Sequence, residues 1–403
     1  MINREIYDEV SRKFREHFGR PHATAAYAPG RIEVLGNHTD YNEGFVLSAA
    51  INLGTFFLSA PSNDSTCRLV AGDLMEEVIF DAVSPVPCTD KPWSNYVKGV
   101  FAGLRQRNQI EKGFEGMFLG NIPLGAGLSS SAALEMAAGL VFCSLYDIQI
   151  DKLDLAKIGQ MAEHEYAGVR CGLLDQISSL CGEENGLVMS DFRTLQVQNL
   201  PLGDSVRFLM CNTNVKHSLV DGKYNELRLQ CEEAVTFFSS VLDHRVSALR
   251  DINREEWEQH SSAMDPTVAR RAAHIIGENE RVLKGKDLIA NSNLHEFGKL
   301  MFDSHRSSVE NFENSCPELD FLVSQAQVIP GVMGARLSGG GFGGSVVVLL
   351  HPRDVEVVSK ALASSYEKEF GHSCDSRVIT PSDGAKILIH RIPRSSSAVK
   401  AAP

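Results

Sequence analysis

Apolar residues recur at helical spacing at the start of the chain. Ile6, Val10, Phe14 and Phe18 are each four positions apart, and this spacing predicts an amphipathic helix that packs on a domain. The stretch lacks the apolar segment that a secretory leader needs. No apolar run in the sequence approaches 18 residues, so the pattern predicts no membrane-spanning helix.

In the rest of the chain, the spacing of apolar residues predicts both strands and helices. Short apolar runs bounded by turn residues predict strands, and longer runs with a period of 3.6 predict helices. Strands are expected at 23–34, 45–51, 55–58, 67–70, 77–80, 116–119, 186–190, 206–212, 345–350 and 385–391. Helices are expected at 93–104, 130–146, 153–169, 172–181, 222–242, 254–278, 293–313, 318–327 and 353–369.

The length of the chain, 403 residues, allows two or three domains with separate cores. Turn residues Pro201 and Gly203 precede a new strand pattern, which predicts a boundary there. We expect an N-terminal domain over 1–203 and a C-terminal domain over 204–392. Residues 393–403 show no periodicity and are predicted to form a disordered tail.

Composition and charge narrow the class of protein. The chain is 43% hydrophobic and 22% charged, as globular proteins are, and its net charge of −12 argues against a nucleic-acid partner. Its nine cysteines are scattered, odd in number and without CxxC spacing. This pattern indicates reduced thiols and a cytoplasmic location.

The most informative stretch runs from residue 121 to 135. Gly125 and Gly127 allow a tight turn and close approach of a ligand, and Ser129, Ser130 and Ser131 follow at the start of an apolar helix. Free N–H groups and the positive end of the helix dipole attract anions, phosphate above all. An ordinary capped helix after a glycine turn fits these residues equally well.

A polar cluster lies at 29–44. It combines Arg31, Asn37, His38 and Asp40 between glycines, the mixture of donors and acceptors that a hydroxyl-rich ligand needs. The alternative is a polar turn between strands, held by Asx-turns of Asp40 and Asn42.

Two carboxylates stand in neighbouring apolar segments at 161–176. Glu163 and Asp175 are separated by a turn between Gly168 and Gly172, and a part-buried carboxylate is costly unless it is paired or functional. Arg31 would be the natural partner of Asp175. A helix-capping role for Asp175 is the plain alternative.

A third glycine-rich stretch occupies 334–345. Its glycines match GxGxxG formally, but they run into a strand at 345–350, whereas a dinucleotide fingerprint must open a helix. The sequence also contains no GxxxxGK[ST], no HRD and DFG pair and no HExxH. Rossmann, P-loop, protein-kinase and zincin classes are therefore excluded.

Taken together, the three motifs resemble those of the GHMP kinases, and within them the galactokinase family. The phosphate loop at 123–132 and the glycine run at 336–344 resemble the second and third motifs of the superfamily, and residues 30–42 resemble the galactokinase signature. Further similar stretches lie at 93–99, 212–218, 224–233 and 315–320. Three separated motifs in the same order are far more specific than any one of them.

The resemblance implies an α+β, two-domain GHMP kinase fold. Its N-terminal domain would be similar to the second domain of ribosomal protein S5, and its C-terminal domain would be ferredoxin-like. ATP and sugar would meet between the domains. The implied reaction is transfer of the ATP γ-phosphoryl group to the anomeric hydroxyl of α-D-galactose, the first step of galactose catabolism, with Mg²⁺.

The resemblance also implies a role for each matching residue. Asp175 would take the C1-hydroxyl proton or assist its loss, and Arg31 would steady developing charge. Glu163 and Ser131 would hold Mg²⁺, with Ser130 as the second choice for the serine. The implied sugar contacts are Asn37, His38, Asp40, Gly172 and Tyr224. The implied nucleotide contacts are Trp93, Asn95, Gly125, Ala126, Gly127, Leu128, Ser129, Ser130 and Ser131.

One pair departs from the family pattern. Glu33 and Asn37 stand where the usual signature has asparagine and glutamate, and the family glutamate contacts the sugar 6-hydroxyl. One hypothesis is that residues 33 and 37 lie close together, so that the exchange preserves a hydrogen-bonded pair. The rival is a relaxed pocket that accepts fucose, arabinose or galacturonate.

Three functions remain open from the sequence. The first is a galactokinase activity, the second a GHMP kinase for another sugar, and the third a catalytically silent galactose and ATP sensor. Because Asp175, Glu163 and the serine run are all present, the sensor is the least favoured. The expected partners are small molecules, without nucleic acid or membrane, and the expected state is a monomer.

Overall fold

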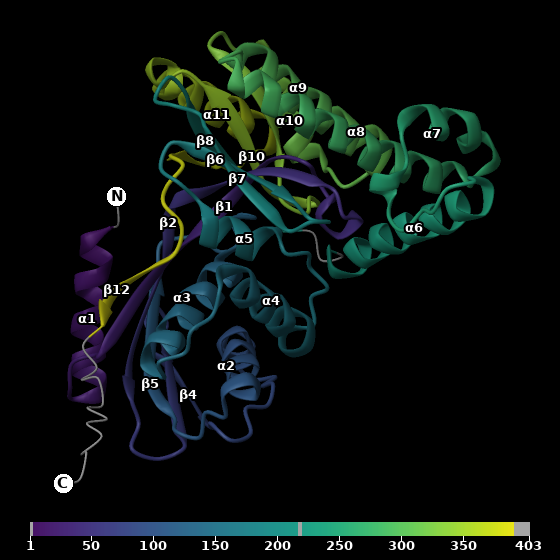
Figure 1. Ribbon diagram of the computed structural model, residues 1–403. Coiled ribbons are helices and arrows are strands. Elements are labelled where there is room, and N and C mark those ends of the chain that lie inside the picture. The colour runs from purple at the N-terminus through teal and green to yellow at the C-terminus, as the bar shows by residue number, and fades with distance from the viewer. Residues whose placement is uncertain (1–2, 217–219, 391–403) are drawn as a thin grey trace.

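The computed structural model describes residues 3–216 and 220–390, which build two lobes around separate sheets (Figure 1). The strands are β1 (Thr24–Leu35), β2 (Phe45–Pro61), β3 (Thr66–Ala71), β4 (Glu76–Asp81), β5 (Phe114–Gly120), β6 (Gly186–Asp191), β7 (Gln196–Pro201), β8 (Arg207–Lys216), β9 (Val332–Ser338), β10 (Gly343–Leu350), β11 (Asp375–Ile379) and β12 (Lys386–His390). The helices are α1 (Arg4–Phe18), α2 (Ser94–Asn108), α3 (Ser130–Leu145), α4 (Lys152–Ala162), α5 (Leu174–Cys181), α6 (Val220–Val241), α7 (Arg254–His260), α8 (Pro266–Ala290), α9 (Leu294–Ser307), α10 (Pro317–Val328) and α11 (Val355–Phe370).

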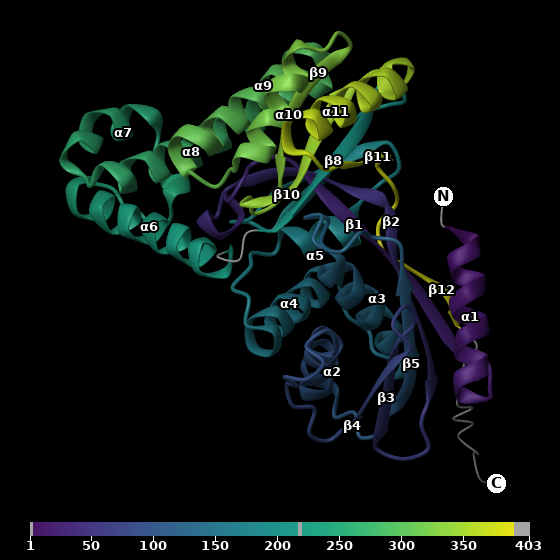
Figure 2. The same cartoon turned by 180° about the vertical axis from the view of Figure 1, so that it is seen from behind.

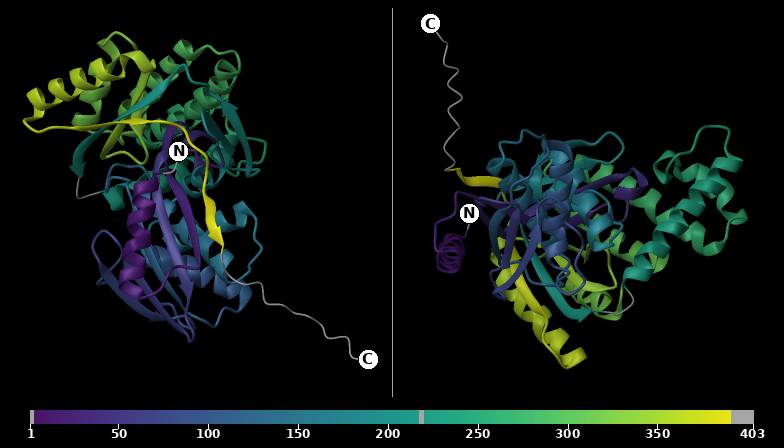
Figure 3. Two further views of the ribbon diagram at one scale, coloured as in Figure 1. Left: turned by 90° about the vertical axis from the view of Figure 1, so that its left-hand side faces the viewer. Right: turned by 90° about the horizontal axis from the view of Figure 1, so that it is seen from below.

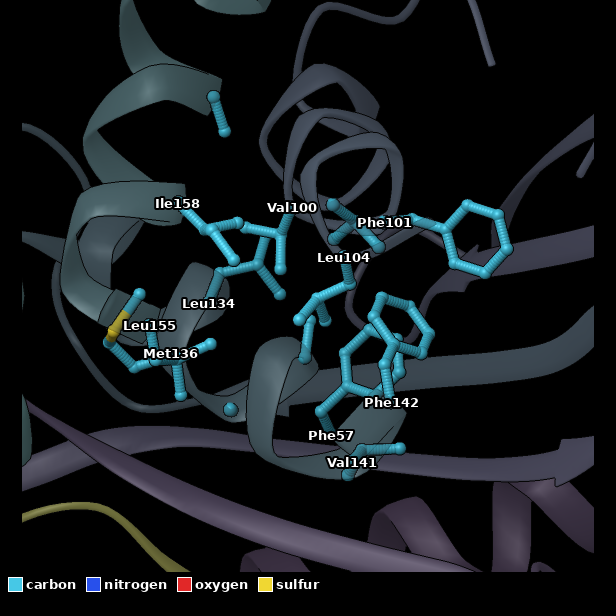
Figure 4. Close-up of a cluster of buried hydrophobic side chains, with 14 of the residues drawn as sticks. Phe57, Val100, Phe101, Leu104, Leu134, Met136, Val141, Phe142, Leu155 and Ile158 are labelled. Carbon is cyan, nitrogen blue, oxygen red and sulfur yellow. The ribbon is translucent and has the colours of Figure 1, made fainter. Parts of the chain in front are cut away.

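The first sheet has eight strands. Six follow the order β12-β1-β2-β5-β3-β4, while β6 pairs with β2 and β7 pairs with β6. Successive residues of a strand point to opposite faces, so Phe56 packs toward α1 while Phe57 packs toward α2 and α3. Figure 4 shows Phe57 with Phe101 and Phe142 in the cluster that these helices cover. Helices on both faces therefore bury the sheet.

The second sheet has four strands in the order β11-β8-β10-β9. One face packs against α10 and α11, and the other forms a shared core with β1, β2 and α9. Helices α6 and α7 and the first half of α8 form an arm at the side of this lobe, with a hydrophobic cluster of its own (Figure 2). The two lobes thus share one core along β1 and β2.

The helix at the N-terminus is confirmed. Asn3 caps α1 through its side chain, and Gly19 ends the helix in a left-handed conformation. Val10 and Phe14 are fully buried against the first sheet, as the apolar spacing predicted.

Two predicted divisions of the chain were wrong. The strands expected at 45–51 and 55–58 are a single strand, β2, because Gly54 makes room for the Tyr27 ring instead of forming a turn. The helix expected at 254–278 is two helices, because Asp265 caps a new helix and Pro266 occupies its first turn.

Three strands were not predicted, namely β7, β9 and β11. Strand β7 lies in the segment that was interpreted as a boundary, where exposed glutamines hide its pairing with β6. The chain passes between the sheets from β7 to β8, close to the expected boundary after residue 203. Strand β12, which was assigned to the C-terminal domain, instead pairs with β1 (Figure 3). The division into domains stays a prediction.

The tail expected at 393–403 lies outside the described residues. None of the helices in residues 3–216 and 220–390 combines the length and the apolar character needed to cross a lipid bilayer. All nine cysteines are free thiols.

Candidate active site

Arg31 on β1 joins Asp175 to the glycine-serine loop. Its Nε donates to Asp175 Oδ1 at 2.8 Å, and its Nη2 lies 2.7 Å from the same oxygen. Its Nη1 donates to the carbonyl of Gly127 at 2.5 Å. The prediction that these three parts of the chain share one site is confirmed.

The glycine before Arg31 explains how the loop comes so close. A Cβ atom at Gly30 would collide with the carbonyl oxygen of Leu128, and the Arg31 N–H donates to that oxygen at 3.1 Å. The loop therefore lies directly along β1. This close approach holds the loop against the strand that carries Arg31.

The three serines point in three directions. The Ser129 hydroxyl donates to Asp175 Oδ2, and the Ser131 hydroxyl donates to Glu163 Oε1 at 3.0 Å. Ser130 instead lines a separate cavity, described below. The Gly-rich turn before them has positive φ at Gly125 and Gly127, as the sequence predicted.

Glu163 occupies a buried position at the end of α4. The helix continues there as one π-helical turn, Glu163–Ala167, and the side chain is 5% exposed. Burial raises the pKa of its carboxyl to about 7, and the nearby Asp175 charge adds to this. A bound cation would stabilise the charged form of this buried carboxyl.

The third glycine-rich stretch braces the glycine-serine loop. It connects β9 to β10 as a hairpin, and Ser345 donates its hydroxyl to the carbonyl of Ala126 at 2.7 Å. Because a strand follows the glycines and no helix begins there, exclusion of the Rossmann fingerprint is confirmed.

All five predicted sugar contacts line one cavity of about 290 Å³. It opens between β1, α5, α6 and the β9–β10 loop, and it also reaches Asp175, Arg31, Ser131 and Glu163. The predicted contacts found there are Asn37, His38, Asp40, Gly172 and Tyr224. Residues from five separate parts of the chain therefore converge on one space.

Asp40 and Gly172 fit against each other in this cavity. A Cβ atom at position 172 would collide with the Asp40 carboxyl, so any other residue would force that carboxyl to move. Burial raises the pKa of Asp40 to about 7, and the charges of Glu33 and Asp175 raise it further, against the lowering effect of Arg31.

His38 is a neutral ring in the same cavity wall. Burial lowers its pKa to about 4, and its Nε2 lies 3.1 Å from the Gly340 carbonyl. The ring packs beside Tyr224, with 5.1 Å between the ring centroids. A rigid aromatic wall of this kind suits the apolar face of a sugar.

Glu33 and Asn37 form the pair that the first hypothesis required. Asn37 Nδ2 donates to Glu33 Oε1 at 2.8 Å and to the Gly339 carbonyl at 2.9 Å. Its Oδ1 accepts from Asn314 Nδ2 at 2.9 Å and from Ser308 at 3.4 Å. Both N–H donors and the oxygen acceptor of the Asn37 amide are thus bonded within the protein.

Buried residues from distant parts of the chain, which were not predicted from the sequence, hold this pair in place. Arg336 is fully buried and donates to Glu33 Oε1 at 2.9 Å. Glu278 on α8 accepts from the backbone N–H groups of Gly36 and Asn37 at 2.8 and 2.9 Å. Glu278 lies more than 240 positions along the chain from its partners, so no local pattern could reveal it.

A second cavity, of about 380 Å³, lies on the other side of the serines. Trp93, Tyr96 and Phe118 give it an aromatic wall, and Ser130 and Ser131 also line it. Asn95, which was expected near the nucleotide, is not among the described residues that line this cavity. Its amide is bonded to the backbone of Cys88. Ser131 lines both cavities.

In residues 3–216 and 220–390, no three histidine, cysteine, aspartate or glutamate side chains gather as a metal cage. Ser131 and Glu163 offer two oxygen donors where the two cavities meet. Mg²⁺ is commonly held by one or two carboxylates with water and substrate phosphates. The donor set therefore fits this ion.

Three family models match the chain. Residues 12–61 match the galactokinase galactose-binding signature, residues 95–183 match the GHMP kinases N terminal domain, and residues 286–368 match GHMP kinases C terminal. The matched segments contain the first motif, the serine run with both carboxylates, and the third glycine-rich stretch. The predicted α+β GHMP kinase fold is confirmed.

Relatives that match this chain over almost their whole length are galactokinases. The chain is 40% identical over 379 residues to a galactokinase of Haemophilus influenzae (strain PittEE), covering 93% of this chain and 97% of the relative. It is 39% identical over 384 residues to a galactokinase of Pasteurella multocida (strain Pm70), covering 94% and 98%.

Solved structures of a galactokinase and a mevalonate kinase share the fold of this chain. The Lactococcus lactis galactokinase complexed with galactose superposes with a TM-score of 0.90 at 34% identity, over 95% of this chain and all of that one. Mevalonate kinase of Methanococcus jannaschii shares the fold, with a TM-score of 0.62 at 19% identity over 89% of this chain and 98% of that one. The chain belongs to the galactokinase family, the members of the GHMP kinases that phosphorylate galactose with ATP.

Proposed function

We propose that this chain transfers the γ-phosphoryl group of ATP to the anomeric hydroxyl of α-D-galactose, with Asp175 as the group that receives the hydroxyl proton. The arrangement of Asp175, Arg31 and Ser131 between two adjoining cavities carries this proposal. Galactose occupies the polar cavity, and the adenine base rests on the aromatic wall of the other. The anomeric oxygen and the γ-phosphate then meet beside Ser131.

The residues act mainly by position and charge. Asp175 accepts the proton as the anomeric oxygen attacks, and Arg31 keeps the carboxylate oriented and stabilises negative charge that builds up beside it. The backbone N–H groups of the glycine-serine loop and the start of α3 hold the phosphate oxygens. In phosphoryl transfer such positioning supplies most of the rate.

We propose that Ser131 and Glu163 hold Mg²⁺. The hydroxyl and carboxylate oxygens suit this hard cation, and phosphate oxygens and water complete its ligand set. When bound, the ion neutralises charge on the transferred phosphoryl group. Trp93, Asn95 and the loop residues from Gly125 to Ser131, except Ser129, whose hydroxyl is bonded to Asp175, remain our candidates for nucleotide contacts. Ser130 is the second choice as the metal hydroxyl.

The sugar specificity is set by the cavity around Asp40 and Glu33. Because the Asn37 amide is fully bonded within the protein, Glu33 is the charged member of the pair left to face the sugar. A carboxylate accepts strongly from a hydroxyl and repels a second carboxylate. These contacts favour galactose over sugars that lack the 6-hydroxyl or carry a 6-carboxylate.

The activity itself is tested with a coupled assay of ADP release across galactose, fucose, arabinose and galacturonate, with and without Mg²⁺. We expect kcat/KM to be highest for galactose and turnover to require the ion. A higher kcat/KM for any of the other three sugars would instead support a relaxed C6 pocket. Absence of ADP release with every sugar would support the sensor.

The pH dependence of galactose use should report on Asp40. With a pKa of about 7, its carboxyl is protonated below that pH and charged above it. The charged form accepts hydrogen bonds from sugar hydroxyls more strongly, so kcat/KM for galactose is expected to fall as the pH drops through about 7. Initial rates at saturating ATP and Mg²⁺ measure this.

Asp40→Asn is the matched control for the pH profile. It keeps the shape of the side chain but cannot ionise, so its kcat/KM should be lower throughout and should lose this inflection. An inflection near the same pH in Asp40→Asn would assign the titration to another group.

We also propose that the enzyme acts in the cytoplasm as a monomer. The nine free thiols support a reducing compartment. Both cavities and every proposed catalytic group lie within one chain, so a partner subunit is not needed to complete the site.

A further inference from the structure

Ser129 differs from an ordinary helix-capping serine. It is the residue before α3, yet its φ and ψ are both 56°, in the left-handed region, where glycine is favoured. Within the described part of the chain its side chain makes no capping hydrogen bond to the first turn of α3. A serine in this place therefore meets a backbone cost without giving the usual benefit of a cap.

The left-handed backbone turns the Ser129 hydroxyl toward Asp175. The hydroxyl donates to Asp175 Oδ2, while Arg31 holds Oδ1 of the same carboxylate. Ser129 is also not among the described residues that line either cavity. Its hydroxyl is therefore committed to the carboxylate.

Resting on the proposed function, we infer that Ser129 is a positioning residue for Asp175, not a phosphate contact as the sequence suggested. Arg31 and Ser129 fix the two carboxylate oxygens separately, so the group cannot rotate away from the sugar. Because the hydroxyl is drawn to Asp175, the free N–H groups at the start of α3 stay open for phosphate. Ser129 thus orients the Asp175 carboxylate and leaves the N–H groups at the start of α3 free to bind phosphate.

The test compares Ser129→Gly with Ser129→Ala. Both remove the hydroxyl, and loss of one hydrogen bond to a charged group is expected to lower kcat roughly 10- to 100-fold. KM for ATP should remain close to that of the parent. Glycine relieves the left-handed backbone and alanine does not, so the Tm of Ser129→Gly should be at least that of the parent and above that of Ser129→Ala.

A double-mutant cycle with Asp175→Asn identifies the partner through which Ser129 acts. If Ser129 works through Asp175, adding Ser129→Gly to Asp175→Asn should cause almost no further loss of kcat. The neighbouring variant Ser130→Gly is the matched control, because Ser130 lines the nucleotide cavity. Its effect should fall on KM for ATP and should add to that of Asp175→Asn.

The outcomes separate this inference from the proposed function. A raised KM for ATP in Ser129→Gly, with a loss that multiplies that of Asp175→Asn, would make Ser129 a phosphate contact and overturn the inference. Full kcat in Ser129→Gly beside an inactive Asp175→Asn would overturn it also, while the proposed function stands. Full kcat in Asp175→Asn would end the proposed role of Asp175, and this inference with it.

Discussion

Replacing Asp175 with asparagine is expected to lower kcat for galactose phosphorylation by about 10²- to 10⁴-fold, the usual contribution of a general base. The amide keeps the size of the side chain and can still accept from Arg31, but it cannot take the proton of the anomeric hydroxyl. ATP binding and the fold should change little. Steady-state ADP release measures kcat, and nucleotide titration measures binding.

Asp154→Asn is the matched control for this variant. Asp154 lies on α4, is 39% exposed and makes only surface ion pairs with Arg107 and Lys157, which contribute little. Its kcat should equal that of the parent. An Asp175→Asn variant with full kcat would remove this carboxylate from the mechanism.

Replacing Arg336 with methionine is expected to destabilise the protein by about 3–5 kcal/mol, because it leaves the buried Glu33 carboxylate without its cation. Arg336 is 0% exposed and donates to the Glu33 carboxylate and carbonyl. For a chain of this length the loss corresponds to a Tm lowered by about 5 °C. Thermal unfolding followed by circular dichroism measures it.

Arg353→Met provides the comparison, because the Arg353 side chain is 81% exposed and its removal should leave Tm almost unchanged. Adding Glu33→Gln to Arg336→Met should restore part of the loss, since the unpaired charge is then gone. An Arg336→Met variant as stable as Arg353→Met would show that the buried pair contributes nothing to stability.

The main local features of the site could be predicted from sequence because neighbouring residues produce them. Gly125 and Gly127 set the turn, and an apolar segment after Ser131 sets the helix. The same local reasoning misassigned Ser129, because a serine before a helix usually caps it. The left-handed backbone at Ser129 and the hydrogen bond of its hydroxyl to Asp175, 46 positions away in the chain, appear only in the tertiary structure.

Local reasoning also missed β9 and the division between α7 and α8. Strand β9 ends in the glycine-rich stretch, whose composition predicts a loop and hides the strand before it. The Asp265 cap with Pro266 was a usable signal for a new helix, and the apolar period across it concealed the break.

The sequence by itself determined most of the helices and strands, the three motifs and the family, because these depend on residue type and spacing along the chain. Only the tertiary structure decided which groups are partners: Arg31 with Asp175, Glu33 with both Asn37 and Arg336, and Glu278 with the turn at Asn37. These contacts join residues up to 303 positions apart. Their strength comes from burial, which removes competing water and makes each unpaired polar group costly, and burial exists only once the two sheets have packed together.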